Sequence, residues 1–145
     1  MGAAAGAVKS VKNATVYDVY FIGKLDKGIY EKSGNVLRKD DIVITEERIV
    51  HIGIKHANDW EKYGSLIQDA LDNPDNVLLD DNPYTVIVLK QIPPAEMGNV
   101  LRITVRLWAE GDKQHYTNSV LTFQRIKEKE ARRLVRNKPV VYKRE

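Results

Sequence analysis

The sequence VLRITVRL, at residues 100–107, decides the fold because its side chains alternate strictly between apolar and polar. Successive side chains of a β-strand point to opposite faces of the sheet. The side chains predicted to face the core are Leu101, Ile103, Val105 and Leu107, and those predicted to face away from it are Arg102, Thr104 and Arg106. This segment predicts a half-buried strand with guanidinium groups on its second face.

Further strand-like segments lie on both sides of this one. They are residues 77–79, 84–92 and 118–125, and residues 140–142 have the composition of a last edge strand. Turn-forming residues separate them, including Asp81-Asn82-Pro83, Pro93-Pro94 and Glu110-Gly111. Short linkers of this kind favour an antiparallel meander over parallel strands joined by helices.

Val16 to Leu25 is rich in β-forming residues, and Ile42 to Ile44 is a short apolar run. The segments between Thr45 and Pro74 are typical of helices. Thr45 is a good helix N-cap, and Glu46 and Glu47 follow it in the first turn, where the helix dipole favours negative charge. A first helix is therefore expected to run to about His56, and a second from about Asn58 to the Asn73-Pro74 stop signal. We predict an α+β fold, with N-terminal helices packed on a four- to five-stranded antiparallel sheet.

Composition limits the class of protein. The chain has 145 residues and no cysteine, which excludes thiol catalysis, disulfides and sulfur-based zinc sites. No stretch approaches the roughly 20 apolar residues of a membrane span. Residues 1–13 are expected to be a linker remnant or an appended sequence, and residues 14–145 to form one domain.

The charge is unevenly distributed along the chain. Nine basic and three acidic residues lie between Arg125 and Glu145, although the net charge is only +3. Such a segment suits a surface that binds phosphates, and it equally suits an ordinary solvated helix face.

Two histidines, His51 and His56, lie on the first predicted helix. Five positions correspond to a separation of roughly 140° around a helix, so the pair does not form one metal-binding face. We therefore expect no metal ion and no cofactor. Histidine suits proton transfer because its ordinary pKa is near neutrality, whereas a lone helical histidine is more often a capping or core residue. His115 is expected to be a surface residue.

Several segments, taken in order, resemble the phage-associated nuclease-like domains grouped with barnase, EndoU, the tRNA-cleaving colicins and RelE (the BECR group). They are DIVITEERIVHIGIKH (41–56), DNPDNVLLDDNPYTVIVLK (72–90), VLRITVRL (100–107), NSVLTFQRI (118–126) and RLVRNKPVVYKR (133–144). The resemblance covers about two thirds of the chain and weakens over residues 1–40.

This resemblance implies a BECR-like ribonuclease fold and metal-independent endoribonuclease activity, often on tRNA. The catalytic residues that it implies are His51, His56, Arg106, Asn118, Ser119 and Thr122. His56 would act as base or acid, His51 as its partner or an RNA ligand, and Arg106 as the charge stabiliser. The remaining three would orient the phosphate or the ribose. Lys90, Arg102 and Arg125 are expected to bind RNA phosphates.

The function expected from this resemblance is that of a toxin domain. It would form the C-terminal part of a larger delivered protein, act as a monomer in the bacterial cytoplasm, and be neutralised by an acidic immunity protein. Two alternatives are a phage head-associated accessory nuclease and a catalytically inactive module that binds RNA or protein.

Overall fold

A computed structural model describes residues 18–55, 58–113 and 117–145 of the chain. The predicted linker at residues 1–13 and the histidines His56 and His115 lie outside these ranges. Within the described ranges, no helix is both long and apolar enough to cross a membrane.

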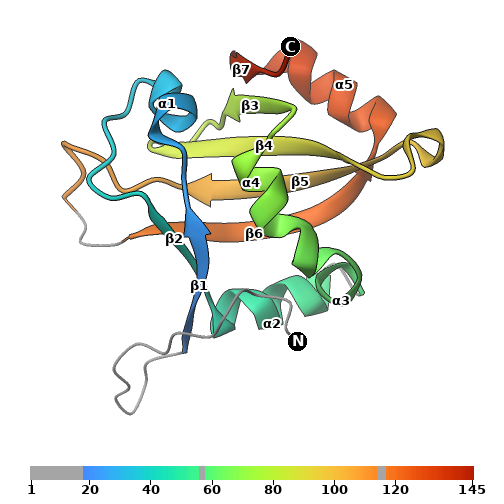
Figure 1. Ribbon diagram of the computed structural model, residues 1–145, viewed down its shortest axis with the longest axis horizontal. Helices are drawn as coiled ribbons and strands as arrows, with labels where there is room; N and C mark the ends of the chain where they lie inside the picture. Colours follow the sequence, from blue (N-terminus) through green and yellow to red (C-terminus); the bar gives the residue numbers. More distant parts are fainter. Residues whose placement is uncertain (1–17, 56–57, 114–116) are drawn as a thin grey trace.

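Seven strands form one mixed sheet in the order β1-β2-β6-β5-β4-β3-β7 (Figure 1). The strands are β1 (Val19–Lys24), β2 (Asp41–Thr45), β3 (Asn76–Leu79), β4 (Thr85–Ile92), β5 (Asn99–Arg106), β6 (Asn118–Lys127) and β7 (Val140–Lys143). The pair β2–β6 is parallel, and every other neighbouring pair is antiparallel.

The helices are short and lie at the edges and on both faces of the sheet. They are α1 (Lys27–Tyr30), α2 (Glu46–Lys55), α3 (Asp59–Tyr63), α4 (Ile67–Asp72) and α5 (Glu128–Asn137), with 3₁₀ turns η1 (Glu31–Ser33), η2 (Gly64–Leu66) and η3 (Ala95–Met97). In Figure 1, α4 lies over the middle strands, and α5 lies beside β3 and the C terminus.

The predicted fold, helices packed on a four- to five-stranded antiparallel sheet, is wrong. The strands β3 to β6 do form a consecutive antiparallel meander, but they are the middle of a larger mixed sheet. The N-terminal pair β1–β2 extends the sheet beyond β6, and β2 lies parallel to β6. Without β2, this edge of β6 would carry a row of backbone N–H and C=O groups without hydrogen-bond partners. The second predicted helix is divided into α3, η2 and α4.

Each face of the sheet has its own hydrophobic core. The inner face packs against α1 to α4, and the outer face packs against α5 through Ala131, Leu134 and Val135. The alternation of β5 is confirmed: Leu101, Ile103 and Val105 are fully buried in the inner core. Arg102, Thr104 and Arg106 face the outer side, where α5 covers only one end of the strand.

The inner core is closed by a buried tyrosine. Tyr30 at the end of α1 donates a hydrogen bond of 2.6 Å from its hydroxyl to the carbonyl of Leu71 in α4. Burial raises the pKa of Tyr30, so its hydroxyl stays protonated and keeps donating. This bond ties the first helix to the fourth, 41 positions later.

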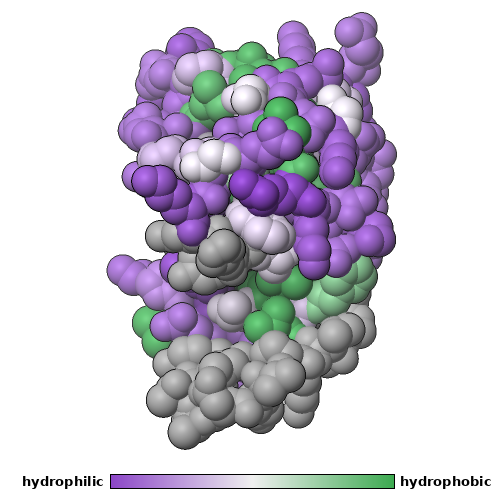
Figure 2. Space-filling model, turned by 90° about the vertical axis from the view of Figure 1, so that its left-hand side faces the viewer, coloured by the Kyte–Doolittle hydropathy of each residue, from purple (hydrophilic) through white to green (hydrophobic). Residues whose placement is uncertain are grey.

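The strand β1 forms one edge of the sheet. Figure 2 shows the molecule from the left-hand side of Figure 1: hydrophilic side chains cover most of the coloured surface, and hydrophobic ones occur in small separate groups.

Candidate functional site

A groove of about 600 Å³ opens where the start of α2 meets the ends of β5 and β6. We call it the α2–β5 groove. It is lined by Thr45, Glu47, Arg48, Asn82, Pro83, Thr85, Arg106, Ser119, Val120 and Leu121. Two of these, Arg106 and Ser119, are among the residues predicted from the sequence, and the register places them opposite each other on neighbouring strands.

Arg106 is held in a fixed direction by three contacts. Its Nη1 lies 2.7 Å from a carboxylate oxygen of Asp112 and also donates to the carbonyl of Leu107. Its guanidinium carbon lies 5.0 Å from the centre of the Tyr84 ring. The side chain of Asp112 is only 3% exposed and that of Arg106 is 21% exposed, so the ion pair is shielded from water and screened less than a surface pair.

The Tyr84 ring is held by two unusual backbone positions. Tyr84 itself has φ 57°, a left-handed conformation that costs on the order of 1–3 kcal/mol outside glycine. Gly111 has φ 89°, and a Cβ there would lie 3.3 Å from the Tyr84 hydroxyl. The carbonyl of Tyr84 also accepts a 2.7 Å hydrogen bond from the amide of Leu107. The turns around Tyr84 therefore hold its backbone in a strained conformation, and in this position its ring contacts Arg106.

The N terminus of α2 supplies the opposite wall of the groove. The amide of Arg48 donates to the hydroxyl of Thr45 at 3.2 Å, which confirms the predicted N-cap. Glu47 and Arg48 follow in the first turn and both line the groove. A carboxylate and a guanidinium from α2 thus face the same groove as Arg106.

His51 is exposed on α2 and does not line the groove itself. It follows Glu47 by four positions and Arg48 by three, which places it one turn further along the same side of the helix. His51 is therefore adjacent to the groove, at its α2 end.

Asn118 is not available to a substrate. It is fully buried and faces the side opposite to Ser119. Its Oδ1 accepts from the amide of Trp108 at 2.7 Å, and its Nδ2 donates to the carbonyls of Lys39 and Asp41 at 2.7 and 2.9 Å. These bonds join three chain segments, so Asn118 holds the sheet together beneath the groove.

The structure places Asn118 and Thr122 on opposite faces of β6, because this strand contains a bulge. The register between β5 and β6 shifts at the step from Thr104 to Val105, which leaves Leu121 as an extra residue. An extra residue reverses the alternation, so Asn118 points inward while Thr122 points outward. Thr122 pairs with Thr104 and lies beyond the lining of the groove.

The three predicted phosphate-binding residues do not lie together. Arg102 shares the outer face with Arg106 and lies four residues closer to the α5 end of β5. The Nζ of Lys90 donates to the carbonyl of Asn73 at the end of α4, at 2.7 Å. Arg125 lies beside α3, where its backbone amide donates to Asp59 at 2.9 Å. Of the three, only Arg102 lies on the same face of the sheet as Arg106, and none of them lines the groove.

Four residues of the groove and its support were missed from the sequence. Glu47 and Arg48 carried a signal, since they directly follow the predicted N-cap of the helix. Tyr84 and Asp112 carried none, because they meet Arg106 only through the turns before β4 and after β5. In the described ranges, no three His, Asp or Glu side chains are grouped so that they could hold a metal ion.

Comparisons of the chain with models of protein families, with curated proteins and with solved structures found no match.

Proposed function

We propose that the protein is a metal-independent endoribonuclease that cleaves RNA in the α2–β5 groove. The observation that carries the proposal is that Arg106, fixed by Asp112 and Tyr84, shares this groove with Arg48, Glu47 and a strand hydroxyl. The predicted fold is wrong, so the proposal rests on this geometry and not on the expected topology.

The groove offers the groups that phosphodiester transfer requires. A base takes the proton of the ribose 2′-hydroxyl, and the 2′-oxygen attacks phosphorus. The bond from phosphorus to the 5′-oxygen breaks, an acid protonates that oxygen, and the products are a 2′,3′-cyclic phosphate and a 5′-hydroxyl. We assign the base to Glu47 and the acid to His51, which lies one helical turn away.

The two arginines stabilise the charge that develops on the phosphate oxygens. A preorganised donor acts most strongly where water is partly excluded and where it does not have to reorient during the reaction. Arg106 meets both conditions, since its ion pair with Asp112 is largely buried. Ser119, on the neighbouring strand, supplies a neutral hydrogen bond to the phosphate or ribose.

The first test is cleavage of total RNA in the presence of EDTA. We expect Arg106→Ala to lower the rate by about 10²–10³-fold, and Glu47→Gln or His51→Ala by about 10²–10⁴-fold. Arg125→Ala is the matched control, since Arg125 lies beside α3 and should leave the rate unchanged. A substrate with 2′-deoxyribose at the cleaved position should resist cleavage.

His56→Ala belongs in the same series, because the sequence resemblance implies a proton-transfer role for His56, which lies outside the described residues. Cleavage that requires added magnesium, or that survives Arg106→Ala, contradicts the proposed mechanism. RNA that binds to the folded protein and stays intact at high protein excess supports the alternative, an RNA-binding module without catalysis.

The biological setting follows from the sequence resemblance and is a separate proposal. A toxin that cleaves tRNA and is neutralised by an acidic immunity protein should prevent recovery of bacterial transformants unless the partner gene is present. Recovery of transformants with active protein but no partner favours the phage accessory nuclease. Complementary charge would speed association with an acidic inhibitor.

A further inference from the structure

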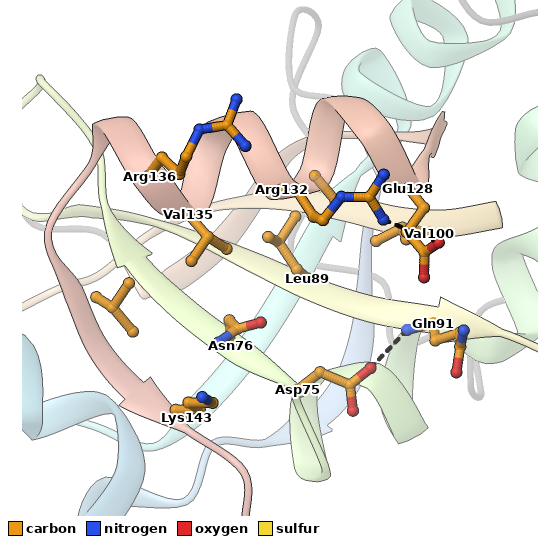
Figure 3. Close-up of a pocket in the computed structure, with 12 residues that line it drawn as sticks. Asp75, Asn76, Leu89, Gln91, Val100, Glu128, Arg132, Val135, Arg136 and Lys143 are labelled. Carbon is orange, nitrogen blue, oxygen red and sulfur yellow. Dashed lines mark hydrogen bonds and ion pairs between the residues drawn. The ribbon is translucent and has the colours of Figure 1, made fainter. Parts of the chain in front are cut away.

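A second cleft, separate from the α2–β5 groove, lies between α5 and the strands β3 and β7 (Figure 3). Its volume is about 670 Å³, within the range of roughly 300–1,000 Å³ found for small-molecule sites. It is lined by Asp75, Asn76, Leu89, Gln91, Val100, Glu128, Ala131, Arg132, Val135, Arg136, Val140 and Lys143. None of these residues lines the groove proposed for RNA cleavage.

The interior of this cleft is aliphatic. Leu89 and Val100 come from the sheet, Ala131 and Val135 from α5, and Val140 from β7. Val140 is 41% exposed although it is a large apolar side chain at a strand edge. The lining contains no aromatic ring on which a nucleobase could stack, which favours a hydrocarbon chain over a nucleotide as the occupant.

The rim of the cleft has an excess of available positive charge. Both carboxylates of the lining already have partners: Glu128 pairs with Arg132 at 3.1 Å, and Asp75 pairs with Arg144 at 2.9 Å. Arg136 on α5 and Lys143 at the end of β7 are exposed and make no ion pair with any described residue. Figure 3 shows them on opposite sides of the opening.

We infer that this cleft binds a small aliphatic anion, with its hydrocarbon chain on the Leu89 and Val100 floor and its charged head between Arg136 and Lys143. The two cations are long and flexible, so their stems can pack on the chain while their charged ends reach a carboxylate or phosphate. The aliphatic floor and the unpaired cations together select this class of ligand.

Calorimetric titration with decanoate and with decyl phosphate tests the inference and distinguishes the two head groups. We expect saturable binding of at least one of them. It should weaken about tenfold or more in the double variant Arg136→Ala/Lys143→Ala, because both charge-assisted contacts to the head group are lost. Arg133→Ala/Lys129→Ala is the matched control, because these α5 residues lie outside the cleft and should leave affinity unchanged.

A second variant tests the aliphatic lining without disturbing the core. Val140→Glu places a carboxylate among the apolar side chains of the cleft and should abolish binding, because it removes an apolar contact and repels the anion. Val36→Glu makes the same change at a valine that is 51% exposed and outside the cleft, and it should have no effect. Circular dichroism should show that all variants keep the fold.

The inference is overturned if neither anion binds saturably, or if binding is unchanged in the double variant and in Val140→Glu. Equal affinity for decanol would show that the cations do not contribute, and equal affinity for adenosine monophosphate would show that the floor does not select a hydrocarbon chain. RNA cleavage is not measured in any of these experiments, so their outcome is independent of the proposed nuclease activity.

Discussion

Asn118 illustrates how a polar side chain can be essential without touching a substrate. All three of its hydrogen bonds go to backbone groups in segments up to 79 positions away. Buried polar groups that lose a partner keep the full cost of their desolvation. Asn118 therefore stabilises the junction of β2, β6 and the end of β5, on which the positions of Ser119 and Arg106 depend.

The variant Asn118→Ala should lower the free energy of unfolding by about 2–4 kcal/mol, because the amide of Trp108 and the carbonyl of Lys39 lose this hydrogen-bond partner and the carbonyl of Asp41 keeps only its bond from the hydroxyl of Thr117. Urea denaturation followed by circular dichroism measures this change. Thr122→Ala, a partly exposed position on the same strand, should change it by less than about 0.5 kcal/mol. Equal effects of the two variants would contradict the structural role of Asn118.

Asp112 acts on the proposed chemistry through Arg106, so we regard it as a positioning residue. Asp112→Asn keeps the shape but removes the charge that fixes the guanidinium, and we expect kcat to fall by about tenfold with little change in KM. Partial recovery of kcat in Asp112→Glu would support positioning. A loss confined to thermal stability, with normal kcat in the folded protein, would contradict it.

At the scale of elements, the C terminus of α4 carries a negative charge that lowers the stability of the folded state. Asp72 is its last residue, where the helix dipole disfavours negative charge. Partial desolvation, with Asp69 and Asp26 nearby, raises the pKa of Asp72 above its usual 3.8. The folded state therefore binds this proton more tightly than the unfolded chain does.

The pH dependence follows from this difference. As the pH rises from below 3.8 through the raised pKa, the folded state must release the proton at a cost that the unfolded chain does not have, so the contribution of Asp72 to stability falls. Asp72→Asn should raise the melting temperature modestly at neutral pH and have no effect below that range. Glu61→Gln, an exposed change on α3, is the control. A variant that destabilises the protein at neutral pH would contradict this account.

At the scale of the whole molecule, local patterns and long-range pairing were not equally predictable. The alternation of β5 and the Thr45 cap depend on neighbouring residues, and both could be predicted from the sequence. The parallel joining of β2 to β6 and the inward turn of Asn118 could not. The first depends on which distant edge is free, and the second on one extra residue, Leu121, in a strand that otherwise alternates.

The residues of the candidate site also differ in how far their positions could be predicted from the sequence. Strand periodicity predicted the outward direction of Arg106, and Ser119 was named only through the sequence resemblance. Lys90 and Arg125 lie against helices on the other side of the sheet. The charge of a side chain alone did not distinguish Arg106, which lines the groove, from Lys90 and Arg125, which do not. The groove depends on turns at Tyr84 and Gly111: the turn at Gly111 was predicted, whereas nothing in the sequence indicated a positive φ angle at a residue as bulky as Tyr84.

The parallel pair β2–β6 also constrains the order in which the chain can fold during synthesis. Ile42 in β2 is the register partner of Asn118, so the hairpin β1–β2 reaches the ribosome exit long before the strand that it pairs with. Contacts across such a long stretch of chain form slowly, because loop-closure entropy must be overcome first. The free edge of β2 therefore stays unpaired until β6 has been synthesised, and a nascent chain stalled before β6 is the species most prone to aggregate.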